Sequence, residues 1–166
     1  MSIVTFKNNR ITIYGDFITL GSKAPDFRLA NASLDDVQLS DYEGKRKILN
    51  IVPSLDTATC QVSTREFNKR ASAYANTVIL VISADLPFAQ NRFCKAENLD
   101  NVIPLSMMRN RDFARDYRVL ITDGPLKGIT TRAVIVLDEH NKVIHAQLVA
   151  DISSEPDYDA VLAVLA

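Results

Sequence analysis

The segment Thr77–Ser83 constrains the fold most strongly, because it reads Thr-Val-Ile-Leu-Val-Ile-Ser and is almost continuously apolar. A strand of this composition has both faces buried, as at the centre of a parallel sheet. A second apolar run, Lys47–Val52, precedes it in the chain and ends at Pro53. Between the two runs, apolar side chains recur at helical spacing over residues 60–74. The order strand, helix, strand predicts an α/β fold.

The rest of the chain continues this alternation. The last helix is expected to start within Ser154–Asp157, which offers a cap, a proline for the first turn and acidic side chains near the positive end of the helix dipole. The other expected elements are strands at residues 102–105, 132–137 and 143–148, helices at 88–97 and 112–117, and a hairpin formed by 4–6 and 11–14. This pattern predicts a three-layer α/β sandwich with a mixed central β-sheet and an N-terminal β-hairpin.

Length and charge exclude several classes of function. The 166 residues suit one domain, residues 1–166, and the formal net charge of −1 gives no basic excess to attract nucleic acid or an acidic membrane surface. No apolar run approaches the roughly 18 residues of a membrane-spanning helix, and the first residues lack the apolar core of a signal peptide. We therefore expect a cytoplasmic protein, in which a purely structural disulfide is rare.

Cys60 is the first candidate for chemistry. It follows the turn after the strand at Lys47–Val52, where a helix is expected to begin. Free backbone N–H groups and the helix dipole favour a thiolate there, and the thiolate is the nucleophilic form of cysteine. The hydroxyls of Thr57 and Thr59 flank this position. The alternative is a small buried apolar residue, and position alone leaves both interpretations open.

Two further side chains could act with Cys60. Cys94 lies in the next predicted helix, so the dithiol chemistry of a C-x-x-C motif is not available. A remote thiol can still attack an oxidised sulfur where the backbone lets the two sulfurs meet; otherwise Cys94 is a core residue. Arg132, at the start of a predicted strand, either stabilises a thiolate in a cleft or lies at the strand edge with a solvated head.

The sequence predicts neither a metal site nor a nucleotide site. His140 and His145 are the only histidines, and with two distant cysteines they have no zinc-binding spacing. The glycine-containing loop Asp123–Gly128 lacks the G-x-x-x-x-G-K-[ST] pattern of a phosphate-binding loop.

The residues around Cys60 resemble those of the peroxiredoxins. Pro53, Thr57 and Cys60 match the family's P-x-x-x-T-x-x-C active-site motif, and Arg132 matches its distal arginine. The closer resemblance is to the bacterial thiol peroxidase subgroup, which is of the atypical two-cysteine type. It covers nearly the whole chain and is carried by residues 23–27, 60–68, 82–90, 92–97, 123–128 and 154–158.

Two positions depart from the pattern of the subgroup. Asn98 and Arg118 stand where glycine is expected in close relatives, each after a predicted helix. Asparagine tolerates a left-handed backbone better than arginine does. Both positions lie outside the active-site motif, so they bear on local loop conformation and not on the reaction.

The resemblance implies a thioredoxin-like fold and reduction of hydrogen peroxide and organic hydroperoxides without metal, haem or flavin. It implies that Cys60 is the peroxidatic cysteine and becomes a sulfenic acid. Thr57, Arg132 and Pro53 would shape the site, and Cys94 would be the resolving cysteine that closes an intrachain disulfide with Cys60. Thioredoxin as reductant, a homodimer and a role in antioxidant defence are implied as well.

Two other classes of function stay open from the residues alone. A thioredoxin-fold disulfide exchanger or redox sensor would use the same cysteines, and only peroxide kinetics separates it from a peroxidase. A binding protein with two structural cysteines is the other class, and titration of thiols after peroxide treatment distinguishes it.

Overall fold

The centre of the molecule is a seven-stranded mixed sheet, seen in a computed structural model that describes all 166 residues. Its strand order is β4-β3-β7-β6-β5-β8-β9. The three central strands β7, β6 and β5 run parallel, and the outer strands pair antiparallel. The strands are β3 (Arg28–Ala30), β4 (Asp36–Gln38), β5 (Arg46–Ile51), β6 (Thr77–Ser83), β7 (Val102–Ser106), β8 (Ala133–Leu137) and β9 (Val143–Leu148). The predicted mixed sheet is confirmed.

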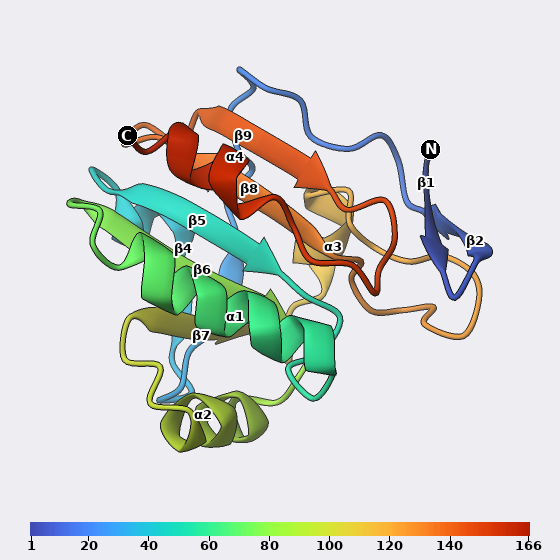
Figure 1. The fold of residues 1–166 in the computed structure, drawn as a ribbon, viewed down its shortest axis with the longest axis horizontal. Helices are drawn as coiled ribbons and strands as arrows, with labels where there is room; N and C mark the ends of the chain where they lie inside the picture. The colour runs from blue at the N-terminus through green and yellow to red at the C-terminus, as the bar shows by residue number, and fades with distance from the viewer.

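Helices lie on both faces of this sheet. In Figure 1, α1 and α4 lie together in front of the sheet, α2 lies beside β7, and α3 lies behind. The helices are α1 (Ala58–Ala71), α2 (Pro87–Ala96), α3 (Asp112–Asp116) and α4 (Tyr158–Ala163), with one 3₁₀ turn, η1 (Leu39–Tyr42). The three-layer α/β architecture predicted from the sequence is therefore present.

Side-chain alternation along the central strands divides the core in two. On β6, Ile79 and Val81 belong to the cluster under α1, whereas Leu80 and Ile82 belong to the cluster on the opposite face. Successive side chains of a strand point to opposite faces, so a strand that is apolar throughout supplies both cores. This explains why Thr77–Ser83 is almost continuously apolar.

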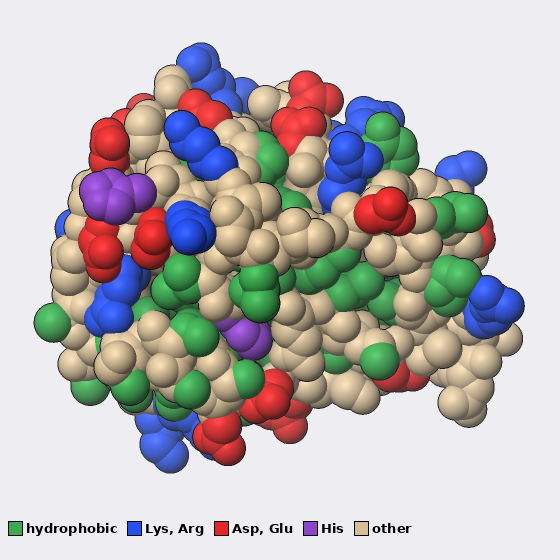
Figure 2. Space-filling view, turned by 90° about the horizontal axis from the view of Figure 1, so that it is seen from above, with side chains coloured by type: hydrophobic (Ala, Val, Ile, Leu, Met, Phe, Trp, Pro, Cys, Tyr) green, Lys and Arg blue, Asp and Glu red, His purple; other side chains and the backbone are tan.

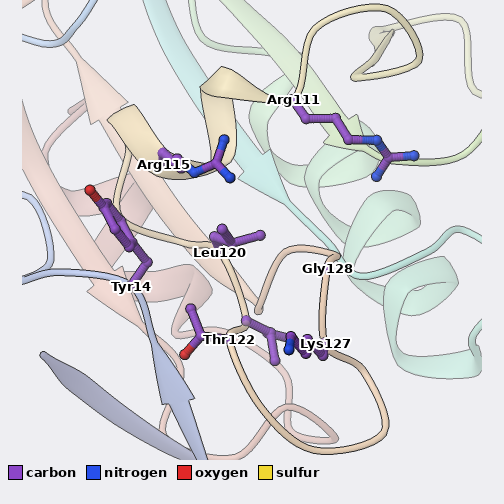
Figure 3. Close-up of a pocket in the computed structure, with 8 residues that line it drawn as sticks. Tyr14, Arg111, Arg115, Leu120, Thr122, Lys127 and Gly128 are labelled. Atoms are coloured by element: carbon purple, nitrogen blue, oxygen red, sulfur yellow. The ribbon is translucent and has the colours of Figure 1, made fainter.

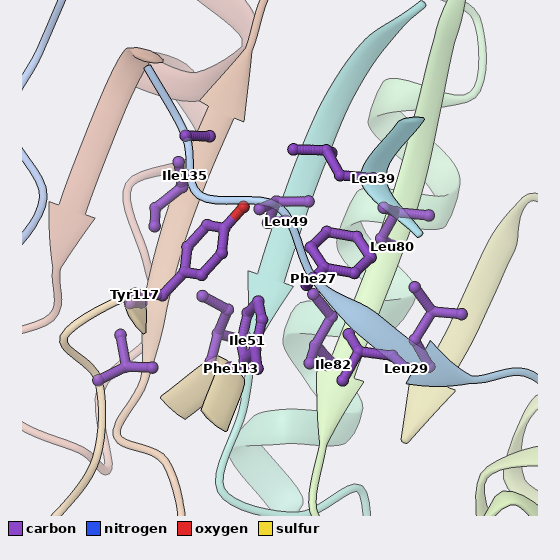
Figure 4. Close-up of a cluster of buried hydrophobic side chains, with 14 of the residues drawn as sticks. Phe27, Leu29, Leu39, Leu49, Ile51, Leu80, Ile82, Phe113, Tyr117 and Ile135 are labelled. Atoms are coloured by element: carbon purple, nitrogen blue, oxygen red, sulfur yellow. The ribbon is translucent and has the colours of Figure 1, made fainter. Parts of the chain in front are cut away.

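The core on the far face is built around stacked aromatic rings (Figure 4). Phe113 of α3 stacks on Tyr117 with ring centroids 4.4 Å apart, and meets Phe27 edge-on at 5.8 Å. The buried hydroxyl of Tyr117 donates to the carbonyl oxygen of Pro25 at 2.6 Å, and burial raises the pKa of Tyr117. These contacts fix the segment before β3 over the sheet, where it completes the third layer.

The N-terminal hairpin is confirmed as a separate two-stranded sheet, β1 (Ser2–Phe6) and β2 (Asn9–Ile13). The backbone of Thr5 bonds to Ala150 and Ile152, after β9, at 2.8 and 2.9 Å. In Figure 1 the hairpin accordingly lies at one end of the sheet, beside the loop that follows β9.

The structure corrects the expected start of the last helix. α4 begins at Tyr158, and Asp157 is its cap, with a carboxylate that accepts from the N–H of Ala160 at 3.1 Å. Pro156 therefore precedes the cap and is not in the first turn. The reason is tertiary: the N–H of Asp157 donates to the side chain of Gln147 on β9 at 2.9 Å, which fixes where the helix starts. The short strands β3 and β4 and the turn η1 were not predicted.

Asn98 and Arg118 both adopt the left-handed backbone that glycine would favour, with φ of 53° and 58°. Asn98 follows α2 and Arg118 follows α3. The side chain of Arg118 lies over the ring of Tyr14, 5.4 Å from its centroid. The departures from glycine therefore leave the left-handed turn in place.

None of the helices combines the length and the apolar character that crossing a membrane requires. On the face shown in Figure 2, acidic and basic side chains are interspersed and form no continuous patch of one sign.

Candidate active site

Cys60 lies in the first turn of α1, as expected from the sequence. β5 ends at Ile51, the buried Pro53 follows, and Thr57 caps the helix. The hydroxyl of Thr57 accepts from the N–H of Cys60 at 3.4 Å and donates to the carbonyl of Ser54 at 3.1 Å. The cap holds Cys60 close to free N–H groups at the positive end of the helix. The side chain of Cys60 is fully buried.

The sheet register brings Arg132 to this helix end. β8 runs antiparallel to β5 and pairs Ala133 with Ile51, so the start of β8 meets the end of β5. Arg132 directly precedes β8 and is 1% exposed. Its Nη2 donates to the sulfur of Cys60 at 3.2 Å, and its Nε donates to the carbonyl of Ile152 at 2.9 Å. The alternative of a solvated strand-edge arginine is wrong.

The buried guanidinium of Arg132 favours a negative charge on the sulfur. Arg132 takes part in none of the ion pairs with carboxylates. A buried cation needs a compensating partner, and arginine does not lose its proton in proteins. The sulfur of Cys60 is the acidic group that the guanidinium contacts. The contact and the helix N-terminus therefore both place positive charge at this sulfur.

A cavity of about 220 Å³ is lined by Arg132 and by the loop and helix start before Cys60, while Cys60 itself is buried behind this lining. Nη1 of Arg132 is buried without a hydrogen-bond partner in the protein, which leaves its N–H groups free to donate to an oxygen atom of a ligand. The lining combines apolar side chains from the hairpin and loops with hydroxyl groups of the helix start: Phe6, Pro53, Ser54, Thr57, Ala58, Thr59, Leu126, Ile129, Arg132, Ile152 and Ser153. The geometry suits a small ligand with a polar end near Arg132 and an apolar remainder.

The largest hollow of the surface lies elsewhere and contains no thiol (Figure 3). It measures about 480 Å³ and carries three cationic side chains, Arg111, Arg115 and Lys127, with Tyr14 at its edge. Cavity size alone would therefore point away from Cys60.

Cys94 lies on α2 and is a free thiol, as is Cys60. It packs against the same apolar cluster that contains Cys60, but it lines a different cavity, of about 250 Å³. Burial raises the pKa of Cys94 to about 11. The structure thus places Pro53, Thr57, Cys60 and Arg132 together and Cys94 apart from them.

Sequence reasoning missed Asp85, whose carboxylate organises the loop before α1. It accepts from the hydroxyl of Ser54 and from the N–H of Leu55, both at 2.7 Å. A signal was available, because Asp85 follows β6 and the carboxyl ends of neighbouring parallel strands meet at one edge of a sheet.

Comparison with known proteins identifies the class to which this fold and site belong. The Redoxin family matches residues 19–162. The chain belongs to this family.

Individual relatives narrow the class. A thiol peroxidase of Corynebacterium glutamicum is 44% identical over 165 residues, covering 99% of each chain. The crystal structure of a peroxiredoxin-like protein from Aquifex aeolicus matches at a TM-score of 0.93 and 37% identity, over 98% of this chain and 95% of the other. The structure of a thiol peroxidase from Chromobacterium violaceum matches at a TM-score of 0.92 and 28% identity, over 98% of this chain and 94% of the other. Within the redoxin family the chain belongs to the thiol peroxidases, which are peroxidase enzymes of the peroxiredoxin group.

Proposed function

We propose that this enzyme reduces hydrogen peroxide and organic hydroperoxides at Cys60. The observation that carries the proposal is the 3.2 Å contact between Nη2 of Arg132 and the buried sulfur of Cys60. The thiolate attacks the terminal oxygen of the peroxide, an S–O bond forms and the O–O bond breaks. The sulfur is oxidised to a sulfenic acid, and the departing oxygen takes up a proton to leave as water or an alcohol. Arg132 stabilises the charge that moves along the O–O bond.

Thr57 and Pro53 have supporting roles in this proposal. The proton of the Thr57 hydroxyl is directed to the carbonyl of Ser54, so Thr57 orients Cys60 through its N–H and does not donate to the sulfur. A lone pair of the hydroxyl is left to accept a hydrogen bond from the incoming peroxide. Pro53 is buried, lines the cavity and shields the sulfur from water.

Cys94 completes the cycle in this proposal. Its sulfur attacks the sulfenic sulfur of Cys60, an intrachain disulfide forms and the hydroxyl group leaves as water. Thioredoxin then reduces the disulfide by exchange, and its own dithiol is oxidised. Cys94 is partly buried and its raised pKa, about 11, keeps it a thiol while α2 is closed. Resolution therefore follows a local opening of the helices and is slower than oxidation.

We further propose a cytoplasmic homodimer for antioxidant defence, with residues 1–166 acting as one domain. Phe6 of the N-terminal hairpin lines the cavity beside Arg132, which makes the hairpin part of the site. Two apolar side chains at the start of α2 stay exposed in the single chain, Leu86 at 52% and Phe88 at 66%, and a second subunit would cover them.

Stopped-flow oxidation tests the proposed activity. Wild-type enzyme, Cys60→Ser and Cys94→Ser are mixed side by side with hydrogen peroxide and with an alkyl hydroperoxide. Wild type and Cys94→Ser should show a fast first step, and Cys60→Ser should show none. If Cys60→Ser consumes peroxide at the wild-type rate, the assignment is wrong. A wild type that exchanges disulfides but does not turn over peroxide would be a disulfide exchanger.

A further inference from the structure

A chain of hydrogen bonds joins the loop before Cys60 to the helix that carries Cys94. At its centre is the carboxylate of Asp85, which takes part in none of the ion pairs. Its Oδ1 accepts from the hydroxyl of Ser54, and its Oδ2 accepts from the N–H of Leu55 and the hydroxyl of Ser83, all at 2.7 Å. Three donors thus compensate one half-buried charge.

On one side, this carboxylate is hydrogen-bonded to the loop that leads to Cys60. The carbonyl of Ser54 accepts from the hydroxyl of Thr57, and that hydroxyl accepts from the N–H of Cys60. The hydroxyl of Ser54 also accepts from the N–H of Asp56 at 3.1 Å. The cap of α1 therefore rests on a loop that Asp85 holds in place.

On the other side, the same carboxylate reaches α2. The hydroxyl of Ser83, which donates to Asp85, accepts from Nε2 of Gln90 at 3.1 Å. Nε2 of Gln90 also donates to the carbonyl of Leu105 at 2.9 Å, and both Gln90 and Ser83 are fully buried. Gln90 lies one helical turn before Cys94 on α2. Any opening of α2 that moves Gln90 breaks these buried bonds.

We propose that Asp85 is a positioning residue that couples the two chemical steps, holding Cys60 against Arg132 while α2 is closed and releasing the loop when Cys94 moves. The inference rests on the proposed roles of the two cysteines. This chain of hydrogen bonds, hereafter the relay, favours the closed state, in which peroxide is reduced. It consists of Ser54, Asp85, Ser83 and Gln90. Its loss favours the open state, in which the disulfide forms.

Asp85→Asn tests the coupling with little change in shape. An amide carries no charge and has one accepting atom in place of two, so Ser54 and Leu55 cannot both donate to it in this geometry. A hydrogen bond to a charged group stabilises a structure by enough to shift a local opening equilibrium about tenfold. We therefore expect oxidation of Cys60 to slow at least about threefold and disulfide formation to accelerate at least about threefold.

Opposite changes in the two steps distinguish coupling from a merely structural role. Stopped-flow measurement resolves the two steps in wild type, Asp85→Asn and a matched control, Asp35→Asn, which removes the same charge from an exposed side chain without hydrogen bonds. The control should match wild type in both steps. If Asp85→Asn leaves both steps unchanged or shifts both in one direction, the inference is wrong.

Hydrogen exchange gives a readout that does not depend on peroxide. In the reduced protein, the amides of residues 90–96 should exchange about tenfold faster in Asp85→Asn than in wild type. Gln90→Met, which cuts the relay at α2 alone, should give the same increase, and the double variant should add little more. Equal exchange in wild type and Gln90→Met would overturn the inference, even if Asp85→Asn folds poorly. If instead wild type shows no peroxide-driven step, the proposed function fails and exchange alone decides the coupling.

Discussion

Replacing Arg132 tests the electrostatic part of the mechanism. Its guanidinium spans two acceptors, the sulfur of Cys60 at 3.2 Å and the carbonyl of Ile152 at 2.9 Å. Arg132→Lys keeps the charge but has no planar fork, so one ammonium group cannot serve both acceptors in the same geometry. Arg132→Met removes the charge and keeps much of the apolar stem.

The structure sets the size of the expected effect. A hydrogen bond that involves a charged group is worth about 1.5–3 kcal/mol, and a tenfold change in rate corresponds to about 1.4 kcal/mol. If the contact with Cys60 strengthens as charge moves to the peroxide, its loss should slow oxidation about 10- to 100-fold. Arg132→Lys should fall near the lower end of this range and Arg132→Met near the upper end.

The assay is the second-order rate of Cys60 oxidation by an alkyl hydroperoxide in stopped flow. Circular dichroism checks that each variant is folded, because Arg132 is buried. Arg111→Met is the matched control, since Arg111 is an exposed arginine of the large hollow that contains no thiol. A folded Arg132→Met enzyme that reacts at the wild-type rate would refute the electrostatic role.

Four further predictions follow from the same geometry. Cys94→Ser should keep the fast first oxidation but lose turnover driven by thioredoxin, and it should accumulate a sulfenic acid that a dimedone probe labels; full turnover would remove Cys94 from the mechanism. Because burial raises the pKa of Cys94 to about 11, alkylation of Cys94 in a Cys60→Ser background should still accelerate between pH 9 and 10. A plateau near pH 8.5, the value of an exposed thiol, would contradict this. Asn98→Ala should be less stable than Asn98→Gly by about 1 kcal/mol, since φ is 53° there, and equal melting temperatures would exclude that cost. Light scattering at micromolar concentration should show a homodimer, and a monomer in both redox states would reject it.

Local pattern in the sequence was enough to predict the central architecture. The continuous apolar run of Thr77–Ser83 predicted a strand with two buried faces, and its bounds agree with β6. The helix that starts before Cys60 was predicted from spacing and from its place after a strand. In contrast, β3 and β4 have three residues each, too few for a period to show.

Two features of the candidate site could not be predicted from the sequence, because they depend on tertiary contacts. Nothing local distinguishes a buried Arg132 from a solvated one; burial follows from the antiparallel register of β8 with β5 and from the carbonyl of Ile152. Asp85 lies within residues 82–90, which resemble the thiol peroxidase subgroup. Its role could not be predicted, because it depends on contacts with Ser54 and Leu55, about 30 residues earlier in the chain. The start of α4 at Tyr158 likewise depends on a contact with β9.

The site of peroxide oxidation is the central claim, and mass spectrometry tests it most directly. The Cys94→Ser variant is treated with one equivalent of alkyl hydroperoxide, digested and analysed by peptide. The mechanism predicts one added oxygen atom on the peptide that contains Cys60 and stoichiometric formation of the alcohol. Loss of the peroxide with Cys60 unmodified, or with the oxygen atom on another residue, would contradict it.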